Sequence, residues 1–355
     1  MDIATFTQIL EIAFEKRVSD IHFEVDNPPL FRARGHLIHS KLSNLTPQDT
    51  EFVAAAVMEQ HGRKMPDELK EFDTSYTLPN VGRFRVSIFR QRGHIGLVMR
   101  VIPHHIGTFE ELNLPPALGN IAKAANGLIL VCGPTGNGKS TTIASIIRYI
   151  NDNFKYNVIT IEDPIEYIFH ANKSCIIQRE VGIDTDNFGG ALKAAMRMDP
   201  DVIMVGEMRD LETIDACVKA AETGHLVLST LHTHNAASTI NRIVGYFPPQ
   251  AQENIRHRLA EILVATVSLR LVRGKSGEVV VPALELMYAT STIKACIRDG
   301  HLDEIESHIE KGGDEYKMQT LDQHLIQLCR QDAITLDEAK RTSRSSDLER
   351  KLIYY

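Results

Sequence analysis

Hydrophobic positions follow two different patterns on the two sides of about residue 102. On the N-terminal side, apolar residues recur at helical spacing between Phe6 and Phe14, and apolar and polar residues then alternate as in half-buried strands. The alternating stretches lie at 21–25, 30–34, 82–89 and 95–101, and a turn at 91–93 would join the last two as a hairpin. This pattern predicts a small α/β unit in which helices cover a sheet.

On the C-terminal side, short and almost continuous apolar runs alternate with helical patterns, and the runs lie at 128–132, 158–161, 202–205 and 226–230. Strands that are apolar on both faces are typical of a parallel sheet with helices on both sides. Such sheets bind ligands at the carboxyl ends of their strands. Beyond about residue 251 the pattern is mostly helical, apart from a hairpin predicted near 273–277.

The segment 102–116 interrupts both patterns, because it is rich in residues that end helices and strands, namely Pro103, Gly107, Asn113, Pro115 and Pro116. We therefore predict an N-terminal domain over 1–101, an interdomain linker over 102–116, and a second domain over 117–355 with a helical C-terminal region. A length of 355 residues also favours two domains, since single cores rarely grow beyond about 250 residues.

Composition excludes several classes of protein. With 43% hydrophobic and 24% charged residues the chain is neither disordered nor collagenous, and no apolar run reaches the roughly 18 residues of a membrane span. The acidic start Met1-Asp2 is unlike a secretory signal, so we expect a cytoplasmic protein. The net charge of −7 offers no general attraction to nucleic acid, and none is expected as a partner. The five cysteines form no CxxC pair, which predicts reduced thiols.

Residues 133–140 read GPTGNGKS and match the phosphate-binding pattern G-x-x-x-x-G-K-[ST]. An apolar strand ends just before this loop and a helical pattern follows it, which is the context that the motif requires. Backbone N–H groups of such a loop surround phosphate oxygens, while Lys139 is expected to reach the β- and γ-phosphates and Ser140 to bind Mg²⁺. The predicted ligands are ATP and Mg²⁺, and the predicted binding residues are Gly133, Thr135, Gly136, Asn137, Gly138, Lys139, Ser140 and Thr141.

Carboxylates follow two of the predicted strands. Glu207 comes directly after the strand 202–205, and we predict that it orients or deprotonates the attacking water. Gly206 stands where a metal-supporting aspartate is usual, so the metal needs a carboxylate from elsewhere. Glu162, in the acidic segment after the strand 158–161, is predicted to serve the magnesium and its water shell. The alternatives are a solvent-exposed carboxylate after a strand for Glu207 and a solvated acidic turn for Glu162.

A histidine lies at each end of the strand 226–230. His232 is at the carboxyl end, on the phosphate side, where an imidazole can bind the γ-phosphate and respond to its loss. His225 is at the other end, and we expect it to be structural or to relay contacts to the bound nucleotide. Zinc binding by these histidines is the alternative, although no cysteine is close in sequence.

Together these motifs resemble the type II/IV secretion ATPase superfamily, and within it the pilus-retraction branch. The resemblance covers nearly the whole chain and rests most on 133–140, 161–166, 206–210, 221–227 and 231–233. It implies a PAS-like N-terminal α+β domain, followed by a RecA-like ATPase domain, and assembly as a homohexameric ring with ATP between subunits. It also implies that two arginines of the N-terminal domain, Arg85 and Arg100 by their spacing, reach the nucleotide and stabilise the transferring phosphoryl group.

The function implied by the resemblance is a motor that hydrolyses ATP to ADP and phosphate and powers type IV pilus retraction and twitching motility. Its partners would be an inner-membrane platform protein and other pilus ATPases, at the cytoplasmic face of the inner membrane. Retraction motors carry a stretch close to Ala-Ile-Arg-Asn-Leu-Ile-Arg, of which the segment 292–298 here retains Ile293, Ile297 and Arg298. An accessory paralogue, a related assembly ATPase and a nucleotide-regulated structural ring therefore stay open as alternatives, with a nucleic-acid motor disfavoured by the charge.

Overall fold

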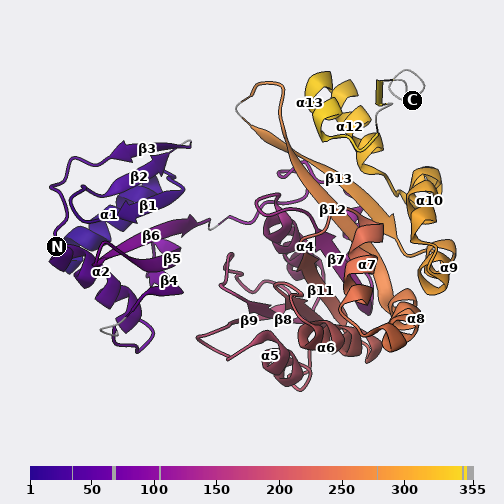
Figure 1. Cartoon of the computed structure of the whole chain (residues 1–355), viewed down its shortest axis with the longest axis horizontal. Coiled ribbons are helices and arrows are strands. Elements are labelled where there is room, and N and C mark those ends of the chain that lie inside the picture. Colours follow the sequence, from indigo (N-terminus) through magenta and orange to yellow (C-terminus); the bar gives the residue numbers. More distant parts are fainter. Residues whose placement is uncertain (34, 66–68, 104, 278, 346–347, 350–355) are drawn as a thin grey trace. The chain divides into compact units, whose positions relative to one another are not determined.

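The computed structural model describes residues 1–33, 35–65, 69–103, 105–277, 279–345 and 348–349. The chain folds into two compact units, which we call the N-terminal unit (1–105 with 164–168) and the C-terminal unit (106–163 with 169–355) (Figure 1). The domain limits 1–101, 102–116 and 117–355 remain predictions. All five cysteines lie in described segments and are free thiols.

The N-terminal unit is an antiparallel sheet in the order β3-β2-β1-β6-β5-β4, with two helices packed against one face. The predicted hairpin is confirmed, since β5 and β6 are joined by a two-residue turn in which Arg92 and Gly93 adopt positive φ angles. The elements are α1 (Ile3–Glu15), β1 (Asp20–Phe23), β2 (Leu30–Ala33), β3 (His36–His39), α2 (Pro47–Glu59), β4 (Glu71–Leu78), β5 (Gly82–Gln91) and β6 (His94–Ile102).

The C-terminal unit is built on a seven-stranded sheet in the order β13-β12-β7-β11-β10-β8-β9. Six strands are parallel and the edge strand β13 is antiparallel to β12, as the predicted hairpin near 273–277 requires. The strands are β7 (Gly127–Cys132), β8 (Asn157–Glu162), β9 (Cys175–Glu180), β10 (Val202–Val205), β11 (Leu226–Leu231), β12 (Leu263–Arg273) and β13 (Val280–Tyr288).

Helices cover both faces of this sheet. Alternate residues of β7 enter two separate cores: Leu128 and Leu130 pack with α5 to α8, whereas Ile129 and Val131 pack with α3 and α4. The predicted α/β class with a two-sided parallel sheet is therefore confirmed. The helices are α3 (Leu118–Ile121), α4 (Lys139–Asn153), α5 (Phe188–Ala195), α6 (Leu211–Glu222), α7 (Ala236–Gly245), η1 (Pro249–Ala251), α8 (Gln252–Ile262), α9 (Ser291–Asp299), η2 (Leu302–Glu304), α10 (Ile305–Lys311), α11 (Gly313–Tyr316), α12 (Leu321–Arg330) and α13 (Leu336–Thr342).

Part of the outer edge of β13 is covered by α12 and the segment that leads into it. Leu286 exchanges two backbone hydrogen bonds with Gln319, at 2.9 and 3.1 Å. Two residues earlier in the strand, the backbone N–H of Leu284 donates to Nδ1 of His324 at 3.0 Å. His324 is 6% exposed, and burial lowers the pKa of its imidazole to about 4. At Leu284 and Leu286 the edge strand therefore has hydrogen-bond partners on its outer side.

The buried neutral His324 predicts that stability depends on pH. Its pKa is near 6.5 in the unfolded chain and about 4 in the folded one, so the unfolded state binds more protons in this range. The free energy of unfolding should fall as the pH is lowered from 6.5 to 4, by up to about 3 kcal/mol. Urea unfolding of the wild type and of His324→Asn at several pH values measures this slope, which the variant should lack.

The matched control is His257→Asn, because the His257 side chain is exposed on α8. This variant should keep the pH dependence of the wild type. Equal slopes for the wild type and His324→Asn would contradict the assignment of the slope to the buried imidazole.

Candidate nucleotide-binding site

The loop 133–138 joins β7 to α4 at the carboxyl edge of the parallel sheet (Figure 1). Gly133 has a φ of +149°, and a Cβ atom there would lie 2.6 Å from the backbone oxygen of Leu269 on β12. Gly138, with a φ of +80°, is the left-handed N-cap from which α4 begins. Glycine is therefore required at both ends of the loop, by close packing at the first and by backbone conformation at the second.

Polar contacts hold the loop in shape. The Lys139 ammonium donates to the backbone oxygens of Gly133 at 2.8 Å and Pro134 at 3.0 Å, and Lys139 is 8% exposed. The side chain of Asn137 accepts a hydrogen bond from the N–H of Leu271 at 2.9 Å, which ties the loop to β12. Asn137 thus supports the loop through its side chain. Ser140 and Thr141 lie half-buried in the first turn of α4.

Strand register brings the ends of four strands, and the predicted residues there, to one edge. β7, β11, β10 and β8 are parallel neighbours, so the residues after them follow on from the same side of the sheet. These residues are Gly133 after β7, His232 after β11, Gly206 and Glu207 after β10, and Glu162 at the last position of β8. The structure therefore brings together the loop, both predicted carboxylates and the predicted phosphate-side histidine.

His232 bridges the loop and the carboxylate of Glu207. Its Nδ1 lies 3.4 Å from Lys139 Nζ and 3.4 Å from Thr135 Oγ1, while its Nε2 lies 3.4 Å from Glu207 Oε2. An ammonium group can only donate, so Nδ1 accepts and the ring proton is on Nε2, facing the carboxylate. The imidazole thus links the lysine of the phosphate loop to the residue predicted to handle the attacking water.

Glu207 is held from a second side by Arg209, an ion pair that sequence reasoning did not predict. The guanidinium contacts Glu207 Oε1 and lies 3.9 Å from Asp163 Oδ2. The hydrogen bond to Glu207 and the nearby negative charge raise the pKa of Arg209 above its ordinary value. The backbone around Glu207 is also fixed, because Thr230 Oγ1 donates to the oxygen of Gly206 at 2.7 Å. Both carboxylate oxygens therefore have defined partners.

Glu162 is buried, with 5% exposure, at the end of β8. Its Oε1 accepts from Thr160 Oγ1 at 2.6 Å and from Gln178 Nε2 at 3.1 Å. Gln178, on β9, fixes the orientation of Glu162, a role that we had not assigned. The hydroxyl of Ser140 and this carboxylate offer oxygen ligands, which are the donors that Mg²⁺ prefers, so the residues present fit the ion.

His225 is separated from the loop. It precedes β11, and its backbone oxygen accepts from the N–H of Gly127 at the amino end of β7, at 3.0 Å. Its ring Nδ1 lies 2.9 Å from the oxygen of Ala220 and 3.2 Å from Thr223 Oγ1. The six residues of β11, about 20 Å of strand, lie between it and the phosphate edge. This geometry does not support the predicted nucleotide contact of His225 within one chain.

Arg85 and Arg100 lie side by side in the N-terminal unit. They are direct partners in the β5–β6 pairing, and Arg100 is also the direct partner of Asp20 in the β1–β6 pairing. Arg100 Nε donates to Asp20 Oδ1 at 2.9 Å, and Arg85 Nη1 lies 3.8 Å from Glu166 Oε1 of the same unit. Because Phe84 is buried in the core, Arg85 points to the opposite face of the sheet. The unit thus presents two adjacent guanidinium groups.

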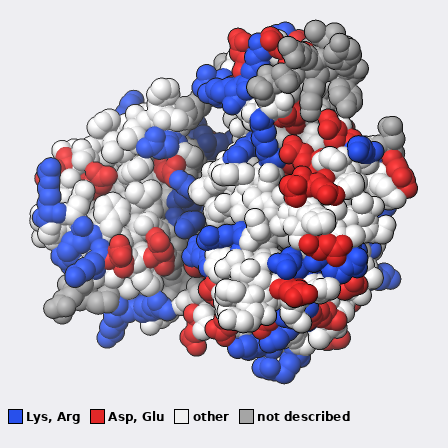
Figure 2. All heavy atoms as spheres, turned by 45° about the vertical axis from the view of Figure 1, so that its right-hand side comes forward, with Lys and Arg blue, Asp and Glu red and all other residues white. Residues whose placement is uncertain are grey.

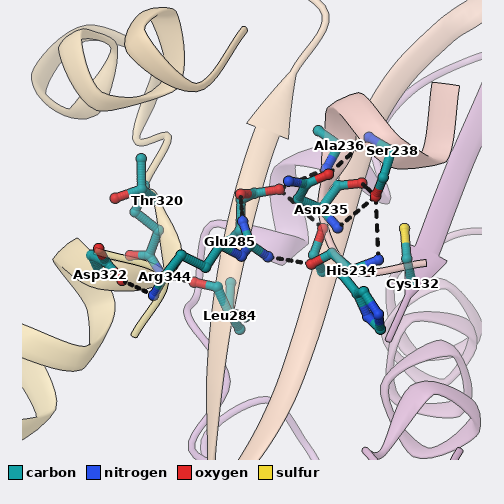
Figure 3. A network of polar contacts seen from close by, with 12 residues as sticks. Cys132, His234, Asn235, Ala236, Ser238, Leu284, Glu285, Thr320, Asp322 and Arg344 are labelled. Carbon is teal, nitrogen blue, oxygen red and sulfur yellow. Dashed lines mark hydrogen bonds and ion pairs between the residues drawn. The ribbon is translucent and has the colours of Figure 1, made fainter. Parts of the chain in front are cut away.

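An ion pair between the buried Glu285 and the partly exposed Arg344 supports the segment that follows His232 (Figure 3). Glu285, on β13 and 1% exposed, accepts through Oε1 from the N–H of Ala236 at 2.8 Å and from Ser268 Oγ at 3.1 Å. Its Oε2 accepts from Nη1 of Arg344 at 2.7 Å, while Nη2 of the same guanidinium donates to the backbone oxygen of His234. Glu285 and Arg344 therefore join the C-terminal segment to the start of α7, four residues beyond His232.

The fold and the site define the class of protein. A parallel sheet with helices on both faces, a glycine-bounded phosphate loop after a buried strand, and carboxylates at the neighbouring strand ends are the features of a RecA-like P-loop ATPase. The chain belongs to the family described as Type II/IV secretion system protein, whose sequence profile matches residues 3–341. The predicted resemblance is confirmed. No helix in the described segments is long and apolar enough to cross a membrane.

Individual relatives cover almost the whole chain. It is 40% identical to the type IV pilus retraction ATPase PilT of Pseudomonas aeruginosa over 97% of this chain and 98% of that protein. It is 39% identical to the type IV pilus ATPase PilU of the same organism, over 98% of this chain and 91% of that protein. Among solved structures, it resembles the pilus retraction motor PilT with bound ADP, with a TM-score of 0.90, 44% identity and 99% coverage of both chains.

The burial of Glu285 predicts a large effect of removing its partner Arg344. Arg344→Met should lower the free energy of unfolding by about 3–5 kcal/mol, because the charge of Glu285 would remain buried without its partner. The double variant Arg344→Met with Glu285→Gln should recover much of this loss. Urea unfolding monitored by circular dichroism gives the three values.

The control is Arg341→Met, because Arg341 forms an ion pair with Glu338 in which its own side chain is 72% exposed. Loss of this exposed pair should cost no more than about 1 kcal/mol. If both arginine variants lose the same free energy of unfolding, the Arg344–Glu285 pair contributes no more to stability than an exposed ion pair.

Proposed function

We propose that this chain is the ATP-hydrolysing motor of type IV pilus retraction. The observation that carries the proposal is the constellation of Lys139, His232 and Glu207 at one sheet edge, in a chain whose relatives include a pilus retraction ATPase. The reaction is attack of water on the γ-phosphate of ATP, which releases ADP and phosphate. Pilin disassembly and twitching motility are the mechanical result.

The chain's own residues have separate tasks in this reaction. Loop N–H groups and Lys139 bind the β- and γ-phosphates, and Glu207 orients the attacking water and accepts its proton. His232, whose Nε2 carries the proton, donates toward the carboxylate or the γ-phosphate side of the site. Ser140 and Glu162 would hold Mg²⁺, which would supply positive charge to neutralise the phosphate oxygens.

The arginines act from a neighbouring subunit in this proposal. Arg85 and Arg100 lie on one exposed sheet face as direct cross-strand partners, a pairing that suits a planar contact with phosphate oxygens. We call the phosphate loop together with Glu162, Glu207 and His232 the cradle. A homohexameric ring with ATP between subunits brings the cradle of one subunit to the arginines of the next. The ring docks on a platform protein at the cytoplasmic face of the inner membrane, beside other pilus ATPases.

A nucleic-acid partner fits less well. Figure 2 shows acidic and basic side chains interspersed on the face in view, without one continuous basic field. A polyanion is attracted by clustered positive charge, and the chain as a whole carries a net charge of −7. Both observations favour a protein partner over a nucleic acid.

An accessory role beside a retraction motor is the second candidate. The two Pseudomonas aeruginosa relatives, PilT and PilU, are almost equally similar to this chain. In addition, α9 carries Lys294 in the segment that corresponds to the C-terminal stretch of retraction motors, which loses the planar fork of an arginine. The near-equal similarity does not separate the two roles, whereas Lys294 favours the accessory one, and a test in cells distinguishes them.

Complementation between inactive variants tests action across subunits. Arg85→Ala and Lys139→Ala should each abolish ATP hydrolysis, because one removes a cation from outside the cradle and the other disables the cradle. Mixed in equal amounts and reassembled, they should restore hydrolysis at about a quarter of the sites, where an intact cradle meets intact arginines. Phosphate release is the measurement.

The matched control mixes Lys139→Ala with Glu207→Gln. Both changes lie in the same cradle, so no mixed site is intact and no activity should return. Recovery in the control mixture, or none in the first mixture while both variants still assemble with wild-type protein, would contradict hydrolysis shared between subunits.

Deletion of the coding sequence tests the cellular role. Cells without a retraction motor should accumulate surface pili and lose twitching, because assembled pili are no longer withdrawn. Imaging of labelled pili gives pilus number and retraction events, and re-expression of the wild type but not of Lys139→Ala should restore retraction. If pili of the deletion strain retract as often and with as much force as those of the wild type, the motor role is contradicted. If they retract but fail against an opposing load, the accessory role is favoured.

A further inference from the structure

Three side chains of metal-binding types converge between α9 and α10. The Sγ of Cys296, a carboxylate oxygen of Glu304 and a ring nitrogen of His308 all lie within 4.8 Å of one another. The three residues come from α9, η2 and α10 respectively, and none of them takes part in the nucleotide site described above. Figure 1 shows α9 and α10 beside each other in the C-terminal unit.

A reversal of the chain creates this convergence. α9 ends at Gly300, a left-handed C-cap with a φ of +84°, and the N–H of His301 then donates to the oxygen of Cys296 at 2.9 Å. The next turn returns along α9 and continues into α10. Glu304 and His308 are four residues apart, so they lie on the same helical face, opposite the cysteine.

The spacing of the groups suits ligands of one ion better than hydrogen bonds. Glu304 Oε2 lies 3.9 Å from His308 Nε2, and Glu304 Oε1 lies 4.0 Å from His301 Nδ1. Both separations exceed the limit for a hydrogen bond. A tetrahedral ion with bonds of about 2.0–2.3 Å keeps its ligand atoms roughly 3.3–3.8 Å apart. The Glu304–His308 pair therefore needs only a small contraction, whereas Cys296 Sγ, within 4.8 Å of both, has to move closer.

The donor set identifies the class of ion. A thiolate and an imidazole favour Zn²⁺ and similar transition-metal ions, whereas Mg²⁺ and Ca²⁺ prefer oxygen ligands alone. Cys296 is 6% exposed and His308 is half-buried, while Glu304 is exposed. The thiol thus forms the inner wall of the cluster, and an ion can enter from the solvent side.

We propose that Cys296, Glu304 and His308 bind Zn²⁺. The fourth ligand would be His301, which lies outside this group of converging atoms and whose exposed side chain has to turn toward the ion. The bound ion would fasten α10 to α9 through four side chains that otherwise make only long contacts with one another. This site is independent of the ATPase reaction and of the magnesium held at the phosphate loop.

Cobalt substitution tests the proposal directly. The full chain is stripped of metal with a chelator and titrated with Co²⁺ in the absence of nucleotide and Mg²⁺. The wild type should bind one Co²⁺ with the near-ultraviolet absorption of a thiolate–cobalt bond and with tetrahedral visible bands, and Zn²⁺ should displace it. Zn²⁺ should also raise the melting temperature of the wild type, because it binds the folded state.

Variants assign the ligands. Cys296→Ser should lose the thiolate absorption and bind more than about 100-fold more weakly, and His308→Gln, Glu304→Gln and His301→Gln should each weaken binding at least about 10-fold. Cys175→Ser, which removes the exposed thiol of β9, is the matched control and should behave as the wild type. Far-ultraviolet circular dichroism checks folding, and the three surface-side variants carry the test if Cys296→Ser does not fold.

Three results would overturn the proposal. They are a wild type without thiolate absorption, a Cys296→Ser variant that retains it, and equal cobalt affinity in the wild type and the His308 and Glu304 variants. Unchanged affinity in His301→Gln alone would remove the fourth ligand from the proposed set.

Discussion

The register of four parallel strands is the constraint on which the site depends. β7, β11, β10 and β8 are aligned so that their carboxyl ends deliver the phosphate loop, His232, Glu207 and Glu162 to one edge. In a sheet buried on both faces, a slip of one residue would exchange the side chains of the two cores. The apolar packing on both sides therefore fixes the chemistry at the edge, although the apolar side chains of the two cores take no part in the reaction.

Within that frame, polar contacts at the strand ends decide how the functional side chains are oriented. His232 contacts both Lys139 and Glu207, and Glu162 is oriented by Thr160 and Gln178. The Glu285–Arg344 pair holds the segment after His232 through bonds to the backbones of His234 and Ala236 (Figure 3). Glu285 also accepts from the first N–H of α7, where the helix dipole favours a negative charge. The C-terminal segment thus helps to fix an element that begins at the phosphate edge.

The parts that could be predicted from the sequence are those with a local signal. The phosphate loop and the apolar strands are visible in residue order, and the edge occupied by Glu162, Glu207 and His232 follows from their positions after strands. The pairs Arg209–Glu207 and Gln178–Glu162 could not be predicted, because side-chain direction at a strand end depends on tertiary packing. The Arg344–Glu285 pair joins residues 59 positions apart, and neither residue has a local pattern that indicates the other.

Strand register alone places Arg85 beside Arg100, but it does not determine how their side chains are oriented. A two-residue turn at Arg92 and Gly93 pairs Gln91 with His94, and counting back along both strands then pairs Arg85 with Arg100. Their adjacency therefore follows from the turn alone. What the turn does not specify is the partner on the third strand, Asp20, which is buried and bonds one edge of the Arg100 guanidinium. Because that guanidinium is planar, a bond at Nε limits its rotation and leaves the two terminal nitrogens in a restricted set of directions. Arg100 is thus oriented from within its own unit, while Arg85 depends on a longer contact with Glu166.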